Sequence, residues 1–158
     1  MIRVQREDFD PGAEMAALTA GRTDIGGVAA FVGLVRDLVP AKQGAEPSRI
    51  NALTLEHYPG MTEKKLAEIE AEAQARWPLQ ASLIIHRYGR LEPGERIVLV
   101  ATASPHRQAA LEACAFLIDW LKTKAPFWKL EETAAGQQWV EARDSDDDAA
   151  ARWSRVAE

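Results

Sequence analysis

The segment from Ser104 to Pro126 restricts the possible folds more than any other part of the chain. It predicts a long helix, because Ser104 can cap the N-terminus, Pro105 suits the first helical position, and Pro126 ends the helix. Apolar residues recur along it at helical spacing and predict a single stripe, formed by Leu111, Cys114, Ala115, Ile118 and Leu121. A helix of this kind packs its stripe against a core, so the other elements have to provide one.

The remaining pattern predicts strands and a second long helix. Residues 59–78 carry a helix signature, with Thr62 as the N-cap, acidic residues in the first turns and Pro78 at the stop. A weaker helix is predicted over 11–20, and a terminal helix begins in the stretch DSDDDAAARW. Strands are predicted over 2–5, 26–37, 50–58, 81–89 and 95–104, followed by a hairpin around Ala135 and Gly136. Runs of strands with two packed helices predict an α+β fold.

The length of 158 residues suits a single domain with one core, which we expect to span residues 1–158. Residues 38–49 contain Pro, Gly and mixed charge without periodicity, so we expect a mobile loop there. Residues 145–158 are expected to form a C-terminal helix or tail. The sequence shows no internal repeat and no sign of a second domain.

Composition excludes several classes of protein. The net charge of −5 and a pI near 5.3 argue against a general nucleic-acid binder, although a local basic site for a small anion stays possible. A single cysteine, Cys114, excludes an internal disulfide and a CxxC zinc site, and burial in the apolar stripe would leave it inert. The charged N-terminus lacks a signal-peptide core, and no apolar run reaches the roughly 18–20 residues of a membrane span. A cytoplasmic protein without membrane contact is therefore expected.

Two sets of basic residues could bind an anion. His106 and Arg107 follow Ser104 at the predicted helix N-terminus, where backbone N–H groups and the helix dipole already attract anions. Cations at that end oppose helix stability, which favours a functional role over an exposed basic turn. Arg36 ends an apolar strand, where pairing with Asp37 is the structural alternative. The three histidines are scattered without metal-ligand spacing, so no metal site is predicted.

The stretch LKTKAPFWKLE, residues 121–131, interleaves lysines with aromatic residues. Lys122 and Lys124 close the helix, where cations complement the negative end of the dipole. Lys129 is different, because the chain should be extended after Pro126. Alternation then places Lys129 on one face with Phe127 and Glu131, and puts Trp128 and Leu130 on the other. A lysine between Phe and Trp is partly desolvated, which favours its use as an acid, a base or a nucleophile.

Several separated motifs, in order, resemble the large catalytic subunit of molybdopterin synthase, the MoaE family. The resemblance runs from about Gly27 to Trp153 and is carried by LTLEHYPGMTEK, RWPL, IIHRYGRLEPGE, AS-x-HR, DWLKTKAPFWKLE and WVEAR. It implies an α/β hammerhead fold and a homodimer core. It further implies a heterotetramer with two copies of a small ubiquitin-like sulfur carrier. The loop 38–49 departs from the family in length and composition.

The resemblance also implies the reaction. The carrier's C-terminal Gly-Gly thiocarboxylate donates sulfur, in two rounds, to cyclic pyranopterin monophosphate and forms the dithiolene of molybdopterin, with no resident cofactor. Lys122 and Lys129 match the catalytic lysines of the family. Basic positions that bind the anions are matched by Arg36, His106, Arg107 and Arg143. We expect Lys122 to face the carrier carboxylate and Lys129 to transfer protons.

One geometric expectation follows from the predicted helix. Arg107 and Lys122 are fifteen residues apart, about 22 Å at 1.5 Å per residue, which exceeds the reach of two side chains toward one small pterin. A shared site would therefore take His106 and Arg107 from the other protomer of a dimer. Two alternatives stay open: a non-catalytic scaffold for a ubiquitin-like partner, and an unrelated enzyme for small anions, such as a phosphatase.

Overall fold

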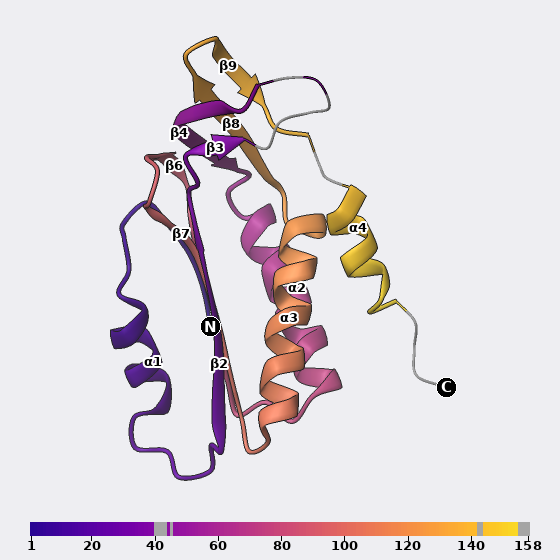
Figure 1. Cartoon of the computed structure of the whole chain (residues 1–158). Coiled ribbons are helices and arrows are strands. Elements are labelled where there is room, and N and C mark those ends of the chain that lie inside the picture. Colours follow the sequence, from indigo (N-terminus) through magenta and orange to yellow (C-terminus); the bar gives the residue numbers. More distant parts are fainter. Residues whose placement is uncertain (40–43, 45, 142–143, 155–158) are drawn as a thin grey trace.

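The computed structural model describes residues 1–39, 44, 46–141 and 144–154. Its elements confirm the predicted α+β class with two long helices (Figure 1). In chain order they are β1 (Ile2–Gln5), α1 (Pro11–Thr19), β2 (Gly27–Leu34), β3 (Leu38–Val39), β4 (Ser48–His57), α2 (Met61–Arg76), β5 (Ala81–Arg87), β6 (Gly89–Leu91), β7 (Arg96–Ser104), α3 (Arg107–Lys124), β8 (Phe127–Thr133), β9 (Gly136–Trp139) and α4 (Asp144–Ala151).

The first sheet has the strand order β1-β5-β7-β2 and carries the main core. Its strands are antiparallel except for β1 and β5, which run parallel. The long helices α2 and α3 cover one face, and α1 lies on the other (Figure 1). Because side chains alternate along β5, Ile84 packs with Phe116 and Leu117 of α3, whereas Leu83 and Ile85 pack with Phe9 on the α1 face.

The second sheet lies at one end of the molecule, above the helices in Figure 1. Its order is β3-β4-β8-β9, with β6 pairing on β4 as well. A small buried cluster of Val35, Leu53, Leu55 and Leu91, with Ile97 against it, joins this sheet to the end of the first. This arrangement agrees with the hammerhead architecture that the sequence motifs imply.

The helix α3 starts later than predicted and buries a different stripe. Ser104 is the last residue of β7, where it pairs with Gly27, so it cannot begin the helix; His106 is the N-cap. The Ser104 hydroxyl still accepts a hydrogen bond from the His106 N–H at 3.2 Å. Leu111 is 62% exposed, so its place in the buried stripe was predicted wrongly. The fully buried face is formed by Ala109, Ala110, Ala113, Cys114, Phe116, Leu117, Trp120 and Leu121.

The start of α2 also differs from the prediction. Gly60 is the N-cap, and Thr62 lies inside the helix with no exposed surface. The Thr62 hydroxyl accepts from the Tyr58 N–H at 3.1 Å and donates to the Pro126 carbonyl at 3.4 Å. Thr62 therefore connects the start of α2 to the turn between α3 and β8, instead of capping its own helix.

The predicted loop 38–49 is shorter than expected. Leu38 pairs with Arg49, and Val39 pairs with Ser48, so both ends of the segment belong to antiparallel strands. The strand that was predicted to start at residue 50 starts at Ser48 for the same reason. Residues 40–43 and 45, in the middle of the predicted loop, lie outside the described part of the chain.

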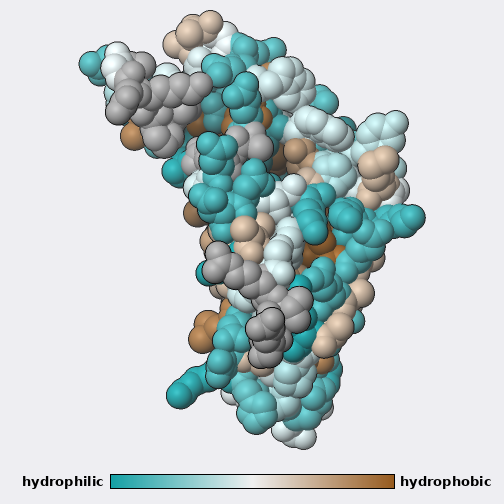
Figure 2. Space-filling model, turned by 90° about the vertical axis from the view of Figure 1, so that its right-hand side faces the viewer, coloured by the Kyte–Doolittle hydropathy of each residue, from teal (hydrophilic) through white to brown (hydrophobic). Residues whose placement is uncertain are grey.

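The terminal helix α4 packs along α3. Ala150 is buried in the main core, and the Trp153 indole N–H donates to Asp119 at 2.7 Å. Trp153 also makes edge contacts with the rings of Trp77 and Phe116. Seen from the α4 side, the surface is mostly hydrophilic, with smaller hydrophobic patches between the charged side chains (Figure 2).

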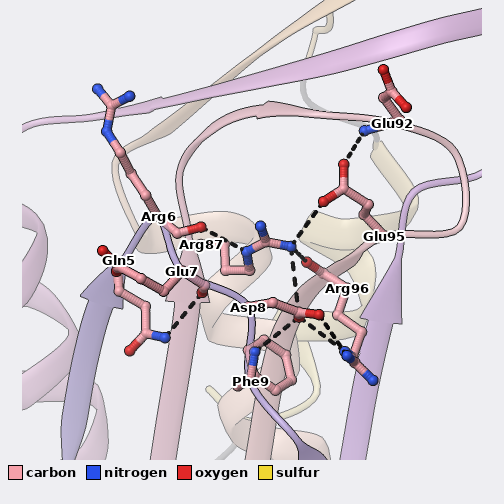
Figure 3. A network of polar contacts seen from close by, with 9 residues as sticks. All are labelled: Gln5, Arg6, Glu7, Asp8, Phe9, Arg87, Glu92, Glu95 and Arg96. Atoms are coloured by element: carbon pink, nitrogen blue, oxygen red, sulfur yellow. Dashed lines mark hydrogen bonds and ion pairs between the residues drawn. The ribbon is translucent and has the colours of Figure 1, made fainter.

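A polar network around Arg87 attaches the segment after β1 to the first sheet (Figure 3). The Arg87 guanidinium is buried and donates to the backbone carbonyls of Arg6 and Arg96, each at 3.0 Å. It also lies 3.4 Å from Glu95 and 3.7 Å from Asp8. Hydrogen bonds from Arg96 hold the pKa of Asp8 low, at about 2. Arg87 is thus a structural residue.

Candidate functional site

The two candidate lysines lie on either side of the turn at Pro126. Lys122 is in the last turn of α3, and Lys129 is the third residue of β8. The predicted change from helix to extended chain is confirmed, and the alternation places Lys129 on the same face as Phe127. Both lysines are exposed. In the register of the second sheet, Lys129 lies opposite the buried Leu55 of β4.

Lys122 faces a carboxylate of its own chain. Its ammonium lies 4.0 Å from an oxygen of Asp146, in the first turn of α4, and both side chains keep solvent contact. Exposed pairs of this kind contribute about 0–1 kcal/mol to stability, so the contact can be exchanged for another at little cost. Lys122 thus lies where a carboxylate can reach it.

Lys124 contacts a different side chain. Its ammonium lies 3.7 Å from the centre of the Trp120 ring, in a cation–π arrangement on its own helix. The contact agrees with the interpretation of Lys124 as a helix-end residue. It makes Lys124 a useful control for the two candidate lysines.

Two histidines from distant segments converge on the strand of Lys129. The His86 ring stacks on Phe127, with centroids 3.6 Å apart and planes 15° apart. His57 lies opposite Phe127 in the sheet, and its ring is 4.3 Å from that of Tyr88. Burial lowers the pKa of His86 to about 4, and the charges of Lys129 and His57 act in the same direction. Sequence reasoning missed this convergence, because neither strand carries a signal for its register.

The anion candidates His106 and Arg107 lie at the opposite end of α3. Both are exposed, and the His106 side chain makes no capping hydrogen bond with the helix. The start of β2 packs closely here, since the Gly26 N–H donates to the Ser104 carbonyl at 3.0 Å. A Cβ at Gly26 would lie 2.0 Å from the Pro105 carbonyl oxygen, so only glycine fits. The basic pair is therefore held on a closely packed corner.

One chain does not bring all the candidates together. Helix α3 is continuous from Arg107 to Lys124, and the fifteen residues between Arg107 and Lys122 correspond to about 22 Å. Arg36, in contrast, follows Val35, which packs with Leu55 beneath the sheet of Lys129. The chain thus brings the segment of Arg36 to the sheet that carries Lys129 and leaves His106 and Arg107 at the far end of α3. Arg143 lies outside the described residues.

The open hollow beside β4 does not complete a site around the lysines. It is lined by Arg6, Thr54, Leu55, Glu56, His57, Tyr88, Gly89 and Arg90, and neither Lys122 nor Lys129 is among them. Leu55 and His57 are the residues opposite Lys129 and Phe127, so the hollow adjoins their strand pair. Both lysines are exposed in the single chain.

Other classes of site find no support in the described residues. Cys114 is buried, and burial raises the pKa of its thiol to about 11, so it is unsuited to nucleophilic chemistry. Within the described ranges, His, Cys, Asp and Glu side chains form no group of three or more that could hold a metal ion. No helix in that part of the chain has both the length and the apolar character needed to cross a membrane.

The outer strand of the first sheet exposes apolar side chains. β2 lies at the end of the strand order, and Val28, Phe31 and Leu34 on it are 37%, 40% and 52% exposed. Leu111, on the neighbouring helix α3, is exposed as well. An edge strand with apolar side chains is a common surface for association with another chain.

Comparisons with known proteins agree with one another. A family model described as MoaE protein matches residues 4–124. The molybdopterin synthase catalytic subunit of Mesorhizobium japonicum is 54% identical over 159 residues, which cover 99% of this chain and 95% of that protein. The solved structure of the molybdopterin biosynthesis MoaE protein from Burkholderia ambifaria matches with a TM-score of 0.81 and 51% identity, over 99% of each chain.

A more distant structure adds support for the fold alone. It is a protein–protein complex of subunits 1 and 2 of molybdopterin-converting factor from Helicobacter pylori. The matching chain has a TM-score of 0.70 and 19% identity, over 90% of this chain and 91% of that one.

Proposed function

This chain belongs to the MoaE family, and we propose that it transfers sulfur from a thiocarboxylated carrier protein to cyclic pyranopterin monophosphate. The family consists of molybdopterin synthase catalytic subunits, so the chain is an enzyme of molybdenum cofactor biosynthesis. The donor is the C-terminal thiocarboxylate of a small ubiquitin-like subunit, and the product is the dithiolene of molybdopterin. The observation that carries this proposal is the placement of Lys122 and Lys129 on either side of Pro126.

Lys122 receives the carrier terminus in this proposal. The donor ends in an anion, and Lys122 already faces the carboxylate of Asp146 at 4.0 Å. That pair is exposed and weak, so an entering carboxylate or thiocarboxylate can replace Asp146 without a large loss of stability. A positive charge at this point also stabilises the oxyanion that develops when the carrier gives up its sulfur.

Lys129 transfers protons to and from the pterin. It is carried by a strand whose first residue, Phe127, stacks on the buried ring of His86, which limits its freedom to move. Fixed placement of a proton-transferring group is what general acid–base catalysis requires. Arg36, at the same end of the molecule, and Arg143 contribute further positive charge toward the phosphate.

His106 and Arg107 come from a second copy of the chain. Their separation of about 22 Å from Lys122 along one helix prevents both groups from reaching one small substrate within a single chain. The exposed apolar edge of β2 and Leu111 offers a surface for a homodimer that would bring the two ends together. With one carrier on each protomer, the assembly is a heterotetramer, which we place in the cytoplasm.

The decisive experiment incubates the protein with a thiocarboxylated carrier and cyclic pyranopterin monophosphate and measures molybdopterin. Lys122→Ala and Lys129→Ala should each lower the rate by at least about a hundredfold, whereas the control Lys124→Ala should stay within a few-fold of the unmodified protein. A scaffold without catalytic function predicts no product in any of these samples. It also predicts that both lysine variants keep every cellular function.

The shared site has its own test. Lys122→Ala chains are mixed with Arg107→Ala chains, and heterodimers are purified with two different affinity tags. A heterodimer with shared sites contains one pocket with both residues intact, so it should recover about half of the unmodified activity. Verified heterodimers that stay as inactive as either parent would show that each site is built from one chain.

A further inference from the structure

The His86 ring lies directly beneath the start of the strand that carries Lys129. His86 is at the end of β5 and is 8% exposed. Its ring stacks on Phe127 with centroids 3.6 Å apart and planes 15° apart. Phe127 is the first residue of β8 and shares a face with Lys129, two residues further on. The contact therefore joins the first sheet to the second within two residues of a candidate catalytic lysine.

A hydrogen bond fixes the orientation of the His86 ring. Nδ1 lies 2.8 Å from the backbone carbonyl oxygen of Arg87. A carbonyl only accepts hydrogen bonds, so Nδ1 carries the hydrogen and the neutral ring keeps its lone pair on Nε2. The bond also satisfies a carbonyl just before the chain leaves β5 for β6. With its ring plane fixed in this way, His86 presents one flat face to Phe127.

The surroundings favour the uncharged ring. Its neighbours on the adjacent strands are Val4 of β1 and Val98 of β7, both apolar. The titratable groups that act on it from the second sheet are Lys129 and His57, both of which oppose a positive charge. The guanidinium of Arg87 is directed into the network with Asp8 and Glu95. An uncharged ring therefore lies under the strand at neutral pH.

A second contact holds the same turn from the side of α2. The Thr62 hydroxyl, fully buried, donates to the Pro126 carbonyl at 3.4 Å. The Phe127 N–H donates to the Ala125 carbonyl at 2.9 Å. Residues 125–127 are thus held on two sides. The Phe127 side chain, which shares a face with Lys129, stacks on the His86 ring and lies 6.4 Å from the His57 ring.

We propose that His86 is a positioning residue for Lys129: its ring, stacked on Phe127, fixes the start of β8 and thereby the direction of the lysine. The proposal rests on the proposed sulfur transfer for its kinetic consequence. Its structural part, that the stack orders residues 127–133, holds or fails without that reaction. His86 itself need not touch the substrate.

Two substitutions separate the ring from the hydrogen bond. His86→Phe keeps a stacking ring and removes the donor to Arg87, whereas His86→Asn keeps an N–H donor and removes the ring. In the molybdopterin assay, His86→Asn should lower kcat by about a hundredfold, the loss expected for a misplacement of about 1 Å, with KM for the pterin nearly unchanged. His86→Phe should restore kcat to within a few-fold of the unmodified protein.

A control variant and a double-mutant cycle distinguish a local effect from a general loss of folding. Ile85→Val changes the neighbouring residue, which is fully buried on the opposite face of β5, and should leave kcat unchanged. Phe127→Leu should lower kcat about as much as His86→Asn, and the double variant should be no worse than either single one. Additive losses would mean that the two side chains act separately, and would overturn the proposal.

Hydrogen exchange supplies a measurement that does not depend on activity. Amides of residues 127–133 should exchange at least tenfold faster in His86→Asn than in His86→Phe or Ile85→Val. Unchanged exchange, or faster exchange with unchanged kcat, overturns the positioning role. If the unmodified protein makes no molybdopterin, the proposed function fails, and the exchange result alone decides whether His86 orders the strand.

Discussion

His86 should lower the stability of this protein at acidic pH, and the substitution His86→Phe should remove this effect. In the folded chain burial lowers the pKa of His86 to about 4, from an ordinary value of 6.5. The unfolded chain therefore binds this proton at a higher pH than the folded chain does. As pH falls from 6.5 toward 4, protonation favours the unfolded state, so stability is present above this window and lost within it.

The size of the effect follows from the same two values. With a difference of about 2.5 pKa units, protonation of His86 lowers the free energy of unfolding by about 3 kcal/mol well below pH 4. At pH 4.5 the loss is about 2.5 kcal/mol. His86→Phe keeps the stacked ring and cannot take up the proton. Between pH 7.5 and pH 4.5, the unmodified protein should therefore lose about 2.5 kcal/mol more free energy of unfolding than the variant does.

Urea unfolding, followed by tryptophan fluorescence at fixed protein concentration, measures this difference. The carboxylates titrate in both proteins and largely cancel in the comparison. Ile85→Val, in the same strand, is the control, and its difference from the unmodified protein should be the same at both pH values. The difference in unfolding free energy between the unmodified protein and His86→Phe should change between pH 7.5 and pH 4.5. A change of less than about 0.5 kcal/mol would show that His86 is not a buried neutral base.

Three further predictions concern other contacts. Asp146→Asn removes the carboxylate near Lys122 and should tighten binding of a carrier C-terminal peptide by up to about fivefold, measured by calorimetry; weaker binding would contradict the exchange of carboxylates at this lysine. Gly26→Ala should destabilise the protein by about 1–3 kcal/mol in thermal unfolding, because its Cβ would overlap the backbone of Pro105, and an unchanged melting temperature would refute this. Arg87→Ala should cost about 3 kcal/mol in urea unfolding, because two main-chain carbonyls lose their donor and Asp8 and Glu95 lose a positively charged neighbour; a loss below about 1 kcal/mol would show that the network is not cooperative.

Local rules determined much of this protein from its sequence. Pro126 cannot continue a helix, so the end of α3 and the extended chain after it could be predicted, and with them the separation of Lys122 from Lys129. The length of α3 was also predictable. Since helical rise is constant, the distance between Arg107 and Lys122 followed without any structure, and the proposal of a site shared with a second chain rests on it.

Tertiary structure decided which positions meet and which faces are buried. Apolar residues lie on more than one side of α3, so spacing alone could not show that Leu111 is exposed; the position of the sheet selected the buried side. The sequence predicts Ser104 as a helix cap, but Ser104 pairs with Gly27 as the last residue of β7, so its backbone belongs to the sheet. The stack of His86 on Phe127 depends on the register between strands far apart in sequence. Strand register is set by long-range packing, which no local pattern encodes.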